Sequence, residues 1–528
     1  MKYIYNLFIV MSLVVLVTSC NDYLDINTNP NQATTVDVEL ILPQALTATA
    51  YSLNGFNTYG AQIGGYAANA GGYGGFNETV TYNYNAGNYS GLWSSVYDNL
   101  EDYQYMIDNS EDVSYSYFKA AAMIMKAYNF QLLVDAYDDI PYTEALQGTK
   151  YLTPAYDDAA AIYADLAKLL DDAISTINTA AELQENGTTM VELKNYDILF
   201  AGNVSQWKKL ANTIKLRIML RANGKVSFSD TSFDSEGFLA TDALINPGFT
   251  RDVSRQNPAW NSWAYGYTGS AATKSWIPTT YVMGFYDGTK LLDTLRGAAI
   301  YYEFPETGTN QLGYENSSVP ACPTGGFWYP GSERDGKVAG DTTGVLKGPD
   351  AGYPAFTAAE SYFLQAEAAV RGIVSGDGKT LFENGIKASF NYTYMLPDGT
   401  VSADTFATAD KKIVYMAGKY KEANTNDYRV NFDKATSTEQ KIEAIITQKY
   451  IALNFVNSHE GWNEYRRTGY PAVSGSNPSE TFASIASQST RGDNLPTRIL
   501  YPSTEVAYNG ANVPQGISPF TSLIFWAK

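Results

Sequence analysis

Residues 118–132 read FKAAAMIMKAYNFQL, and this stretch decides the fold class. Its apolar side chains recur every three or four positions, at Phe118, Ala121, Met125, Tyr128 and Leu132. An α-helix places positions three and four apart on the same face. The spacing therefore predicts a helix with one apolar stripe that packs against a core.

Similar stripes further along the chain predict more helices. After the turn-like stretch 138–151, Thr153 and Pro154 are predicted to open a helix. Asp157 and Asp158 would lie in its first turn, where carboxylates interact favourably with the helix dipole. Its stripe consists of Ile162, Leu166, Leu169, Ala173 and Ile177. A third helix is predicted from Ser205, with Trp207, Leu210, Ile214 and Ile218 facing inward.

Two capping boxes mark helix starts in the C-terminal half. Thr357 with Glu360, and Ser437 with Gln440, have the spacing in which two side chains cap each other's backbone N–H groups. Helix hairpins of this kind stack as in tetratricopeptide arrays, although no clean period of about 34 residues is present. The chain is therefore predicted to be mainly α, built on tetratricopeptide-like helix hairpins.

Two long stretches lack a helical period. Residues 51–91 alternate Gly or Asn with Tyr, and residues 236–354 are rich in Gly and Pro and hold several tryptophans. Loops this long in a compact domain are usually functional or disordered. Because both stretches are rich in aromatic residues, we expect them to be ordered.

The N-terminus has the layout of a secretory signal, with Lys2, a mostly apolar stretch over 4–17 and small residues before Cys20. The apolar stretch is shorter than the roughly 20 residues that span a membrane, so residues 1–19 are interpreted as a cleaved signal peptide. The residues before Cys20 resemble a bacterial lipobox, so its thiol is predicted to carry the acyl chains of an anchor. Residues 20–50 would form a lipidated tether. An uncleaved helix or a soluble secreted product is the alternative.

The composition argues against a nucleic-acid partner and against an intramolecular disulfide. The chain has 36 basic and 55 acidic side chains and a net charge of −19, so nucleic acid is not an expected partner. Cys20 and Cys322 are the only cysteines, and once Cys20 is acylated no intramolecular disulfide can form. Asp22 and Asp25 resemble the acidic export tag that sends lipoproteins of Bacteroidetes to the outer cell surface.

Residues suited to catalysis are few, and no cofactor or metal is predicted. His459 is the only histidine, so a His-rich metal site cannot form, and we expect this residue to pack or to face solvent. Asp138 and Asp139 could in principle serve glycoside hydrolysis, but they are interpreted as turn residues at a helix end. Arg217 and Arg221 share a helix face and could grip a carboxylate, although pairing with acidic neighbours is the preferred interpretation.

Six stretches in a characteristic order carry a family resemblance. They are CNDYLDINTNPNQAT (20–34), LILPQAL (40–46), YDILFAGNVSQWKKLANTIKLRIMLR (196–221), TAAESYFLQAEAAVRG (357–372), QKYIALNFVNSHEGWNEYRRTGYP (448–471) and LPTRILYPSTEVAYN (495–509). Together they resemble the SusD/RagB family of nutrient-binding outer-membrane lipoproteins, and most closely its SusD-like second subfamily.

The resemblance implies a single helical domain over residues 51–528, in which four tetratricopeptide-like hairpins form a superhelical scaffold. Irregular loops, including the loop-rich insertion 236–354, would form the ligand-binding face. It also implies a non-enzymatic surface protein that captures glycans or peptides and acts as a lid on a TonB-dependent SusC-like barrel transporter of the outer membrane. Cys20 is the only residue to which the resemblance assigns a role.

The ligand-binding residues are predicted from their own chemistry. They are Trp260, Trp263, Tyr265, Tyr267 and Trp276 from the insertion, with Tyr66, Tyr73 and Phe76 from the first glycine-rich loop. Flat rings on stiff loops suit the apolar faces of sugars or peptide side chains. As an alternative, these rings pin the loops onto the helices or dock the transporter. Two other function classes stay open: a surface glycoside hydrolase, which needs two carboxylates in a cleft, and a structural or adhesive surface protein.

Overall fold

The computed structural model describes residues 36–222, 224–328 and 343–528, and these are mainly helical, as predicted. The helices are α2 (Val38–Ile63), α3 (Glu78–Thr81), α4 (Ser90–Asp108), α5 (Ser116–Tyr137), α6 (Ala159–Glu185), α7 (Val204–Ala222), α8 (Pro258–Trp263), α9 (Thr280–Met283), α10 (Thr294–Ile300), α11 (Ala358–Val370), α12 (Gly378–Tyr394), α13 (Ala409–Ala423), α14 (Thr438–Ala452), α15 (Ser458–Thr468) and α16 (Ser503–Tyr508). The strands are β1 (Ala67–Asn69), β2 (Ile140–Pro141), β3 (Tyr156–Asp157), β4 (Ala243–Ile245), β5 (Trp276–Pro278) and β6 (Tyr353–Phe356). They pair antiparallel as β1 with β5, β2 with β3, and β4 with β6.

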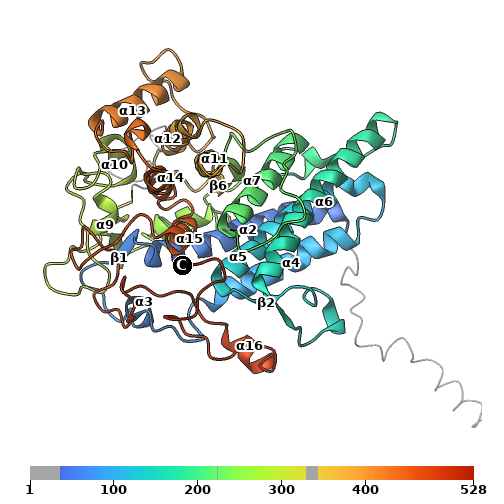
Figure 1. Ribbon diagram of the computed structural model, residues 1–528, viewed down its shortest axis with the longest axis horizontal. Coiled ribbons are helices and arrows are strands. Elements are labelled where there is room, and N and C mark those ends of the chain that lie inside the picture. Colours follow the sequence, from blue (N-terminus) through green and yellow to red (C-terminus); the bar gives the residue numbers. More distant parts are fainter. Residues whose placement is uncertain (1–35, 223, 329–342) are drawn as a thin grey trace, which may run out of the picture.

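Consecutive long helices pack against each other as hairpins. α4 packs on α5, α5 on α6, α6 on α7, and α11 on α12. Figure 1 shows α2 and α4 to α7 in one half of the molecule and α10 to α14 in the other. α15 packs on both α2 and α14, so it joins the two halves. This arrangement confirms the predicted scaffold of tetratricopeptide-like hairpins.

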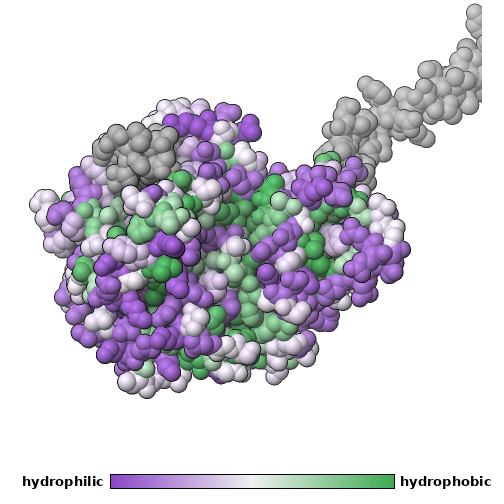
Figure 2. Space-filling view, turned by 90° about the horizontal axis from the view of Figure 1, so that it is seen from above, coloured by the Kyte–Doolittle hydropathy of each residue, from purple (hydrophilic) through white to green (hydrophobic). Residues whose placement is uncertain are grey.

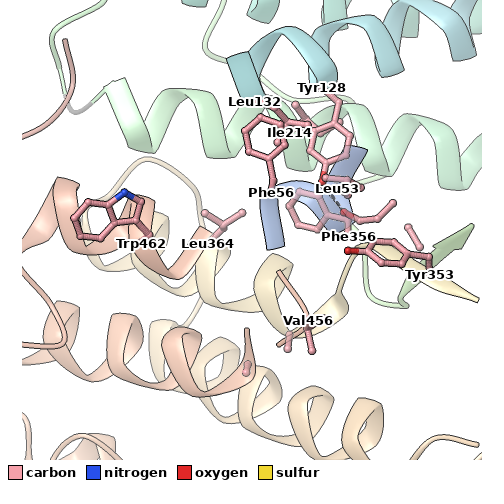
Figure 3. Packing of buried hydrophobic residues seen from close by; sticks show 14 of the residues in the cluster. Leu53, Phe56, Tyr128, Leu132, Ile214, Tyr353, Phe356, Leu364, Val456 and Trp462 are labelled. Atoms are coloured by element: carbon pink, nitrogen blue, oxygen red, sulfur yellow. Dashed lines mark hydrogen bonds between the residues drawn. The ribbon is translucent and has the colours of Figure 1, made fainter. Parts of the chain in front are cut away.

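The hydrophobic core extends through both halves of the molecule, and α2, α5 and α7 all contribute to it. All five side chains of the predicted stripe in α5 are buried. Figure 3 shows Tyr128 and Leu132 of α5 near Ile214 of α7. Leu53 and Phe56 of α2 belong to the same cluster. The spacing of three and four thus correctly predicted a helix, but α5 is buried on nearly all sides rather than along one stripe, because neighbouring helices cover it all round.

The helix predicted to open at residues 153–154 begins at Ala159 instead. The carboxylate of Asp157 accepts hydrogen bonds from the backbone N–H groups of Tyr142 and Thr143, at 2.9 Å and 2.8 Å, and this segment pairs with β2 as the strand β3. Asp158 is the N-cap, and its side chain accepts a hydrogen bond from the N–H of Ala161 at 2.9 Å. Capping by this carboxylate therefore sets the start of α6, rather than the proline upstream.

α2 occupies part of the chain that was predicted to be tether and irregular loop. It spans residues 38–63, so the predicted boundary between residues 50 and 51 falls inside a helix. Gly60 shows why composition misled the prediction, because a Cβ there would lie 2.0 Å from the backbone nitrogen of His459 in α15. This glycine permits close packing of two helices rather than a turn.

The described part of the insertion 236–354 contains only short elements, as predicted. Its longest helix is α10, with seven residues. Seen from above, the molecule is mostly hydrophilic over the half that carries α12 and α13, and hydrophobic residues line a hollow there (Figure 2).

Charged side chains from five helices meet in the interior. We call nine of them the buried ionic core: Asp135 of α5, Arg217 and Arg221 of α7, Glu360 and Glu367 of α11, Lys449 of α14, and Glu460, Glu464 and Arg467 of α15. Each is 3% exposed or less. Arg221 contacts Asp135 and Glu460, and Arg217 lies 3.7 Å from Glu460. The preferred interpretation of the two arginines, pairing with acidic neighbours, is confirmed.

The same cluster corrects half of a predicted capping box. Thr357 caps α11 as predicted, since its hydroxyl accepts a hydrogen bond from the N–H of Glu360 at 3.2 Å. The carboxylate of Glu360 lies 3.4 Å from both Arg217 and Lys449, instead of reaching back to the cap. Burial alone would raise the pKa of Glu464, but Arg467 and Lys449 lower it to about 2.

Candidate functional site

Three segments far apart in the sequence meet around β1 and β5. The two strands pair with Asn69 opposite Trp276. The side-chain amide of Asn69 donates to the carbonyl of Tyr314 at 3.1 Å, and loop 71–77 forms a backbone bridge with loop 313–322. The glycine-rich loop is therefore held against β5 on one side and against the second loop on the other.

Four aromatic rings lie on these segments, and we call them the aromatic face: Tyr73, Phe76, Trp276 and Tyr314. Phe76 and Trp276 are half-buried and pack edge to face, with ring centroids 5.1 Å apart. Tyr73 and Tyr314 are each 43% exposed. A supported ring pair with exposed tyrosines beside it can pack against the apolar face of a ligand while the hydroxyls stay available.

Tyr267 is a third exposed ring in this region, in addition to the two tyrosines of the aromatic face. It is 50% exposed and lies in the hairpin that is closed by a bridge between Tyr265 and Ala271. This hairpin leads directly into β5. Of the eight predicted ligand-binding residues, Tyr73, Phe76, Tyr267 and Trp276 thus present at least part of a ring to solvent.

The other four predicted residues are covered by protein. They are Tyr66, Trp260, Trp263 and Tyr265, which are 8% exposed or less. Trp263 packs against Trp328 and Phe455, with ring centroids 5.4 Å and 4.6 Å away. Tyr66 stacks on Tyr450 at 4.3 Å, and its hydroxyl donates to the carbonyl of that residue at 3.0 Å. These rings fix the loops to the helical scaffold, which corrects their prediction as ligand contacts.

Tyr314 was absent from the sequence prediction. It stands in QLGYENSS at residues 311–318, which shares the Gly, Asn and Tyr composition of the first glycine-rich loop. That composition, applied to the whole insertion, would have included it. Its position beside β1 could not be predicted, because the contact with Asn69 spans 245 positions of the chain.

The polar candidates from the sequence have structural partners. Asp138 accepts a hydrogen bond from the N–H of Phe525 at 2.7 Å, and Asp139 accepts one from the N–H of Ala159 at 2.9 Å. Both are turn residues, as predicted, and burial raises the pKa of Asp138 to about 6. His459 is packed in the core, and burial lowers its pKa from 6.5 to about 4, so the ring is neutral at neutral pH.

Cys20, the predicted lipidation site, lies outside the described residues, as do Asp22 and Asp25. Within residues 36–222, 224–328 and 343–528, no helix is long and apolar enough to cross a membrane. In the same part of the chain, no group of three or more His, Cys, Asp or Glu side chains is placed to hold a metal ion.

Two family models match the chain. Residues 30–243 match a SusD-like model described as "Starch-binding associating with outer membrane". Residues 349–521 match a model described as "Susd and RagB outer membrane lipoprotein". A search of curated proteins found no match.

Solved structures share the fold over nearly the whole chain. A SusD homologue from Bacteroides fragilis is 19% identical, with a TM-score of 0.63 over 94% of this chain and 100% of that one. A chitin-binding SusD homologue from Flavobacterium johnsoniae is 20% identical, with a TM-score of 0.64 over 92% and 99%. A SusD/RagB family protein from Bacteroides thetaiotaomicron is 19% identical, with a TM-score of 0.64 over 93% and 99%. With both halves matched and the fold shared, the chain belongs to the SusD/RagB family of outer-membrane lipoproteins.

Proposed function

We propose that this protein is a cell-surface nutrient-binding lipoprotein. It captures a glycan, or alternatively a peptide, and delivers it to a partner TonB-dependent SusC-like barrel transporter in the outer membrane. The family match over residues 30–243 and 349–521 carries this proposal. One matched model is described as starch-binding and one solved relative as chitin-binding, so oligosaccharides are the first ligands to test.

The aromatic face is the proposed contact surface. Sugar rings present C–H groups that pack against flat aromatic rings, while their hydroxyls bond to polar neighbours. Phe76 already supports Trp276 in one orientation, so binding needs little further ordering of that ring. Tyr73, Tyr267 and Tyr314 would add both ring surface and hydroxyl groups.

The proposed membrane attachment is a lipid at Cys20, with the protein facing the cell exterior. Two or more acyl chains hold a protein on a bilayer where one gives only marginal binding. Val36, the first described residue, follows Cys20 by sixteen positions. Because an extended chain of that length reaches about 55 Å at most, the helical domain would stay close to a barrel in the same membrane.

The first experiment measures ligand binding and turnover together. The soluble chain starting at Asn21 is titrated calorimetrically with maltoheptaose, chitohexaose and a mixture of oligopeptides, and the supernatants are analysed by chromatography. Saturable binding without products supports the proposal. New products would instead favour the surface glycoside hydrolase, and a lack of saturable binding would favour a structural or adhesive protein.

A second experiment tests the transporter. The lipidated protein is affinity-purified from detergent-solubilised native membranes, and the proteins that accompany it are identified by mass spectrometry. A large barrel protein in roughly equal amount is expected. The variant Cys20→Ala is the control for anchoring, because it should leave the membrane fraction. Recovery of the lipidated protein without any barrel protein contradicts the proposed partner.

A further inference from the structure

A second concave surface lies between α11, α12 and α13. It encloses about 560 Å³, which falls within the range of roughly 300 to 1,000 Å³ that is typical of small-molecule sites. Residues 240–244, which lead into β4, form one wall. In Figure 1, α12 and α13 lie at the top of the left-hand half, and β1 lies lower, beyond α14. This cavity is therefore separate from the aromatic face.

One face of α12 lines the cavity with polar side chains. Asn384, Lys387, Ala388 and Asn391 follow the spacing that places residues on a single helix face, and all four line the cavity. The buried side chains of the same helix include the large apolar residues Phe382, Ile386 and Phe390. A polar face is usual where a surface helix meets open water, but this one faces α11 and residues 240–244 across a concavity.

Hydrogen-bonding capacity in the cavity is unused by the protein. In the described part of the chain, the side chains of Tyr362, Asn384 and Asn391 have no hydrogen-bond or ion-pair partner. All three are half-buried. Each amide can donate two hydrogen bonds and accept two, and the phenol can do both. A ligand in the cavity would therefore meet donors and acceptors that need not give up an existing partner.

The charges around the cavity nearly balance. Lys387 supplies one positive charge, and Asp242 and Asp410 can supply negative ones. Asp242 accepts a hydrogen bond from the N–H of Ala358 at 2.8 Å, and burial raises its pKa to about 6. Ile413 adds apolar surface. A strongly charged ligand would gain little net attraction here, whereas a neutral polar ligand could use every group.

We infer that this cavity is a second binding site of the protein, for a neutral, hydroxyl-rich ligand such as a short stretch of an oligosaccharide. Amides and carboxylates match hydroxyls that both donate and accept, and the ring of Tyr362 can pack against a sugar face. The choice of a glycan rests on the proposed function, whereas the site itself rests on the cavity and its unpartnered side chains. Two sites on one protein would hold a long chain at two points and raise its effective concentration.

The test is a calorimetric titration of the soluble chain with maltoheptaose and with chitohexaose. The double variant Asn384→Ala/Asn391→Ala removes both amides from the cavity. Asn426→Ala, which removes an exposed amide after α13 and outside the cavity, is the matched control. The wild type and the control are expected to bind at two sites. The double variant should keep its melting temperature and lose the second site, or bind there at least about tenfold more weakly.

The outcomes separate this inference from the proposed function. If the double variant binds an oligosaccharide with the stoichiometry and affinity of the wild type, the second site is overturned and the proposed function stands. If no form binds either oligosaccharide, both assignments to glycans fail. The same titration is repeated with the mixture of oligopeptides. If the wild type binds peptides but no glycan, and the double variant loses that binding, the cavity is a peptide site and the inference is wrong in its ligand class.

Discussion

In the buried ionic core, nine charged side chains are 3% exposed or less, whereas in the aromatic face Tyr73 and Tyr314 are 43% exposed. Both sets reverse the usual placement of their residue types, because charges normally stay in water and large rings normally pack inside. In the core, every charge has an opposite charge close by.

The aromatic face has no such compensation within the described chain. The phenol groups of Tyr73 and Tyr314 contact no partner there, and only Phe76 and Trp276 support each other. Residue type alone therefore does not reveal the role of a side chain. Side chains whose partners all lie inside the chain maintain the fold, and those without partners are available to a ligand.

The largest loss of stability is expected from removing a carboxylate of the buried ionic core. Glu460→Ala leaves Arg217 and Arg221 without a carboxylate that now lies beside both. Removing one partner of a buried ion pair costs about 3 to 5 kcal/mol of stability. A value toward the lower end of this range is expected here, because the two arginines keep another carboxylate each, Glu360 and Asp135 respectively. Urea denaturation monitored by circular dichroism measures this loss as a lower midpoint.

The matched control is an ion pair at the surface. Lys168 and Asp172 pair on α6 with side chains 57% and 49% exposed, and solvent screens such pairs. Lys168→Ala should therefore leave the urea midpoint unchanged within error. Equal midpoints for Glu460→Ala and Lys168→Ala would mean that the buried ionic core does not hold the helices together.

A second prediction separates two tryptophans that the sequence treats alike. Trp263 is 3% exposed and packs against both Trp328 and Phe455, so Trp263→Ala leaves a cavity and should cost about 3 kcal/mol of stability. Trp276 is half-buried, and Trp276→Ala should lower the melting temperature much less. The opposite order of melting temperatures would contradict the assignment of Trp263 to the fold and of Trp276 to the aromatic face.

The third prediction concerns the pH dependence of stability. Burial lowers the pKa of His459 from 6.5 to about 4, so the folded protein binds fewer protons than the unfolded chain between these values. Stability from this residue is fully present above pH 6.5 and declines as the pH falls toward 4, by about 2 kcal/mol at pH 5.

Comparison with a variant isolates this contribution. The carboxyl groups of Asp138 and Asp242, whose pKa values are raised to about 6 by burial, act in the opposite direction. They are present in both the wild type and His459→Gln, so the difference in denaturation free energy between pH 7 and pH 5 reports on the histidine alone. Parallel pH profiles for the two proteins would show that His459 is not held neutral.

Periodicity and capping patterns predicted the helical part of the fold well, because they depend on neighbours a few positions apart. The stripe in α5 and the cap at Thr357 are both local features. α2 was missed partly because Gly60 is explained only by its contact with the backbone of α15, about 400 positions away. Glu360 was assigned to its own cap, since its partners Arg217 and Lys449 lie on other helices.

The candidate site was predicted at the level of segments but not of residues. Both glycine-rich and tryptophan-rich stretches do contribute exposed rings. Burial, however, depends on what each ring meets, and Trp263 meets Phe455 from a distant part of the chain, whereas Tyr267 meets solvent. The composition of the loops is the same for both residues. The sequence therefore predicted segments that carry exposed rings, without distinguishing the buried rings from the exposed ones.

The fourth prediction, with the smallest change in free energy, compares two exposed tyrosines, one in the aromatic face and one outside it. Tyr73→Ala should leave stability unchanged, because the ring is 43% exposed, and should weaken binding of chitohexaose or maltoheptaose roughly fivefold through loss of one stacking ring. Tyr508→Ala on α16 is the control, since that ring is 81% exposed and lies on another part of the surface. Titration calorimetry gives both dissociation constants. Equal dissociation constants for Tyr73→Ala and Tyr508→Ala would mean that exposure alone does not make a ring available for binding. The ring pair of Phe76 and Trp276, whose members support each other, would then distinguish the aromatic face from other exposed rings.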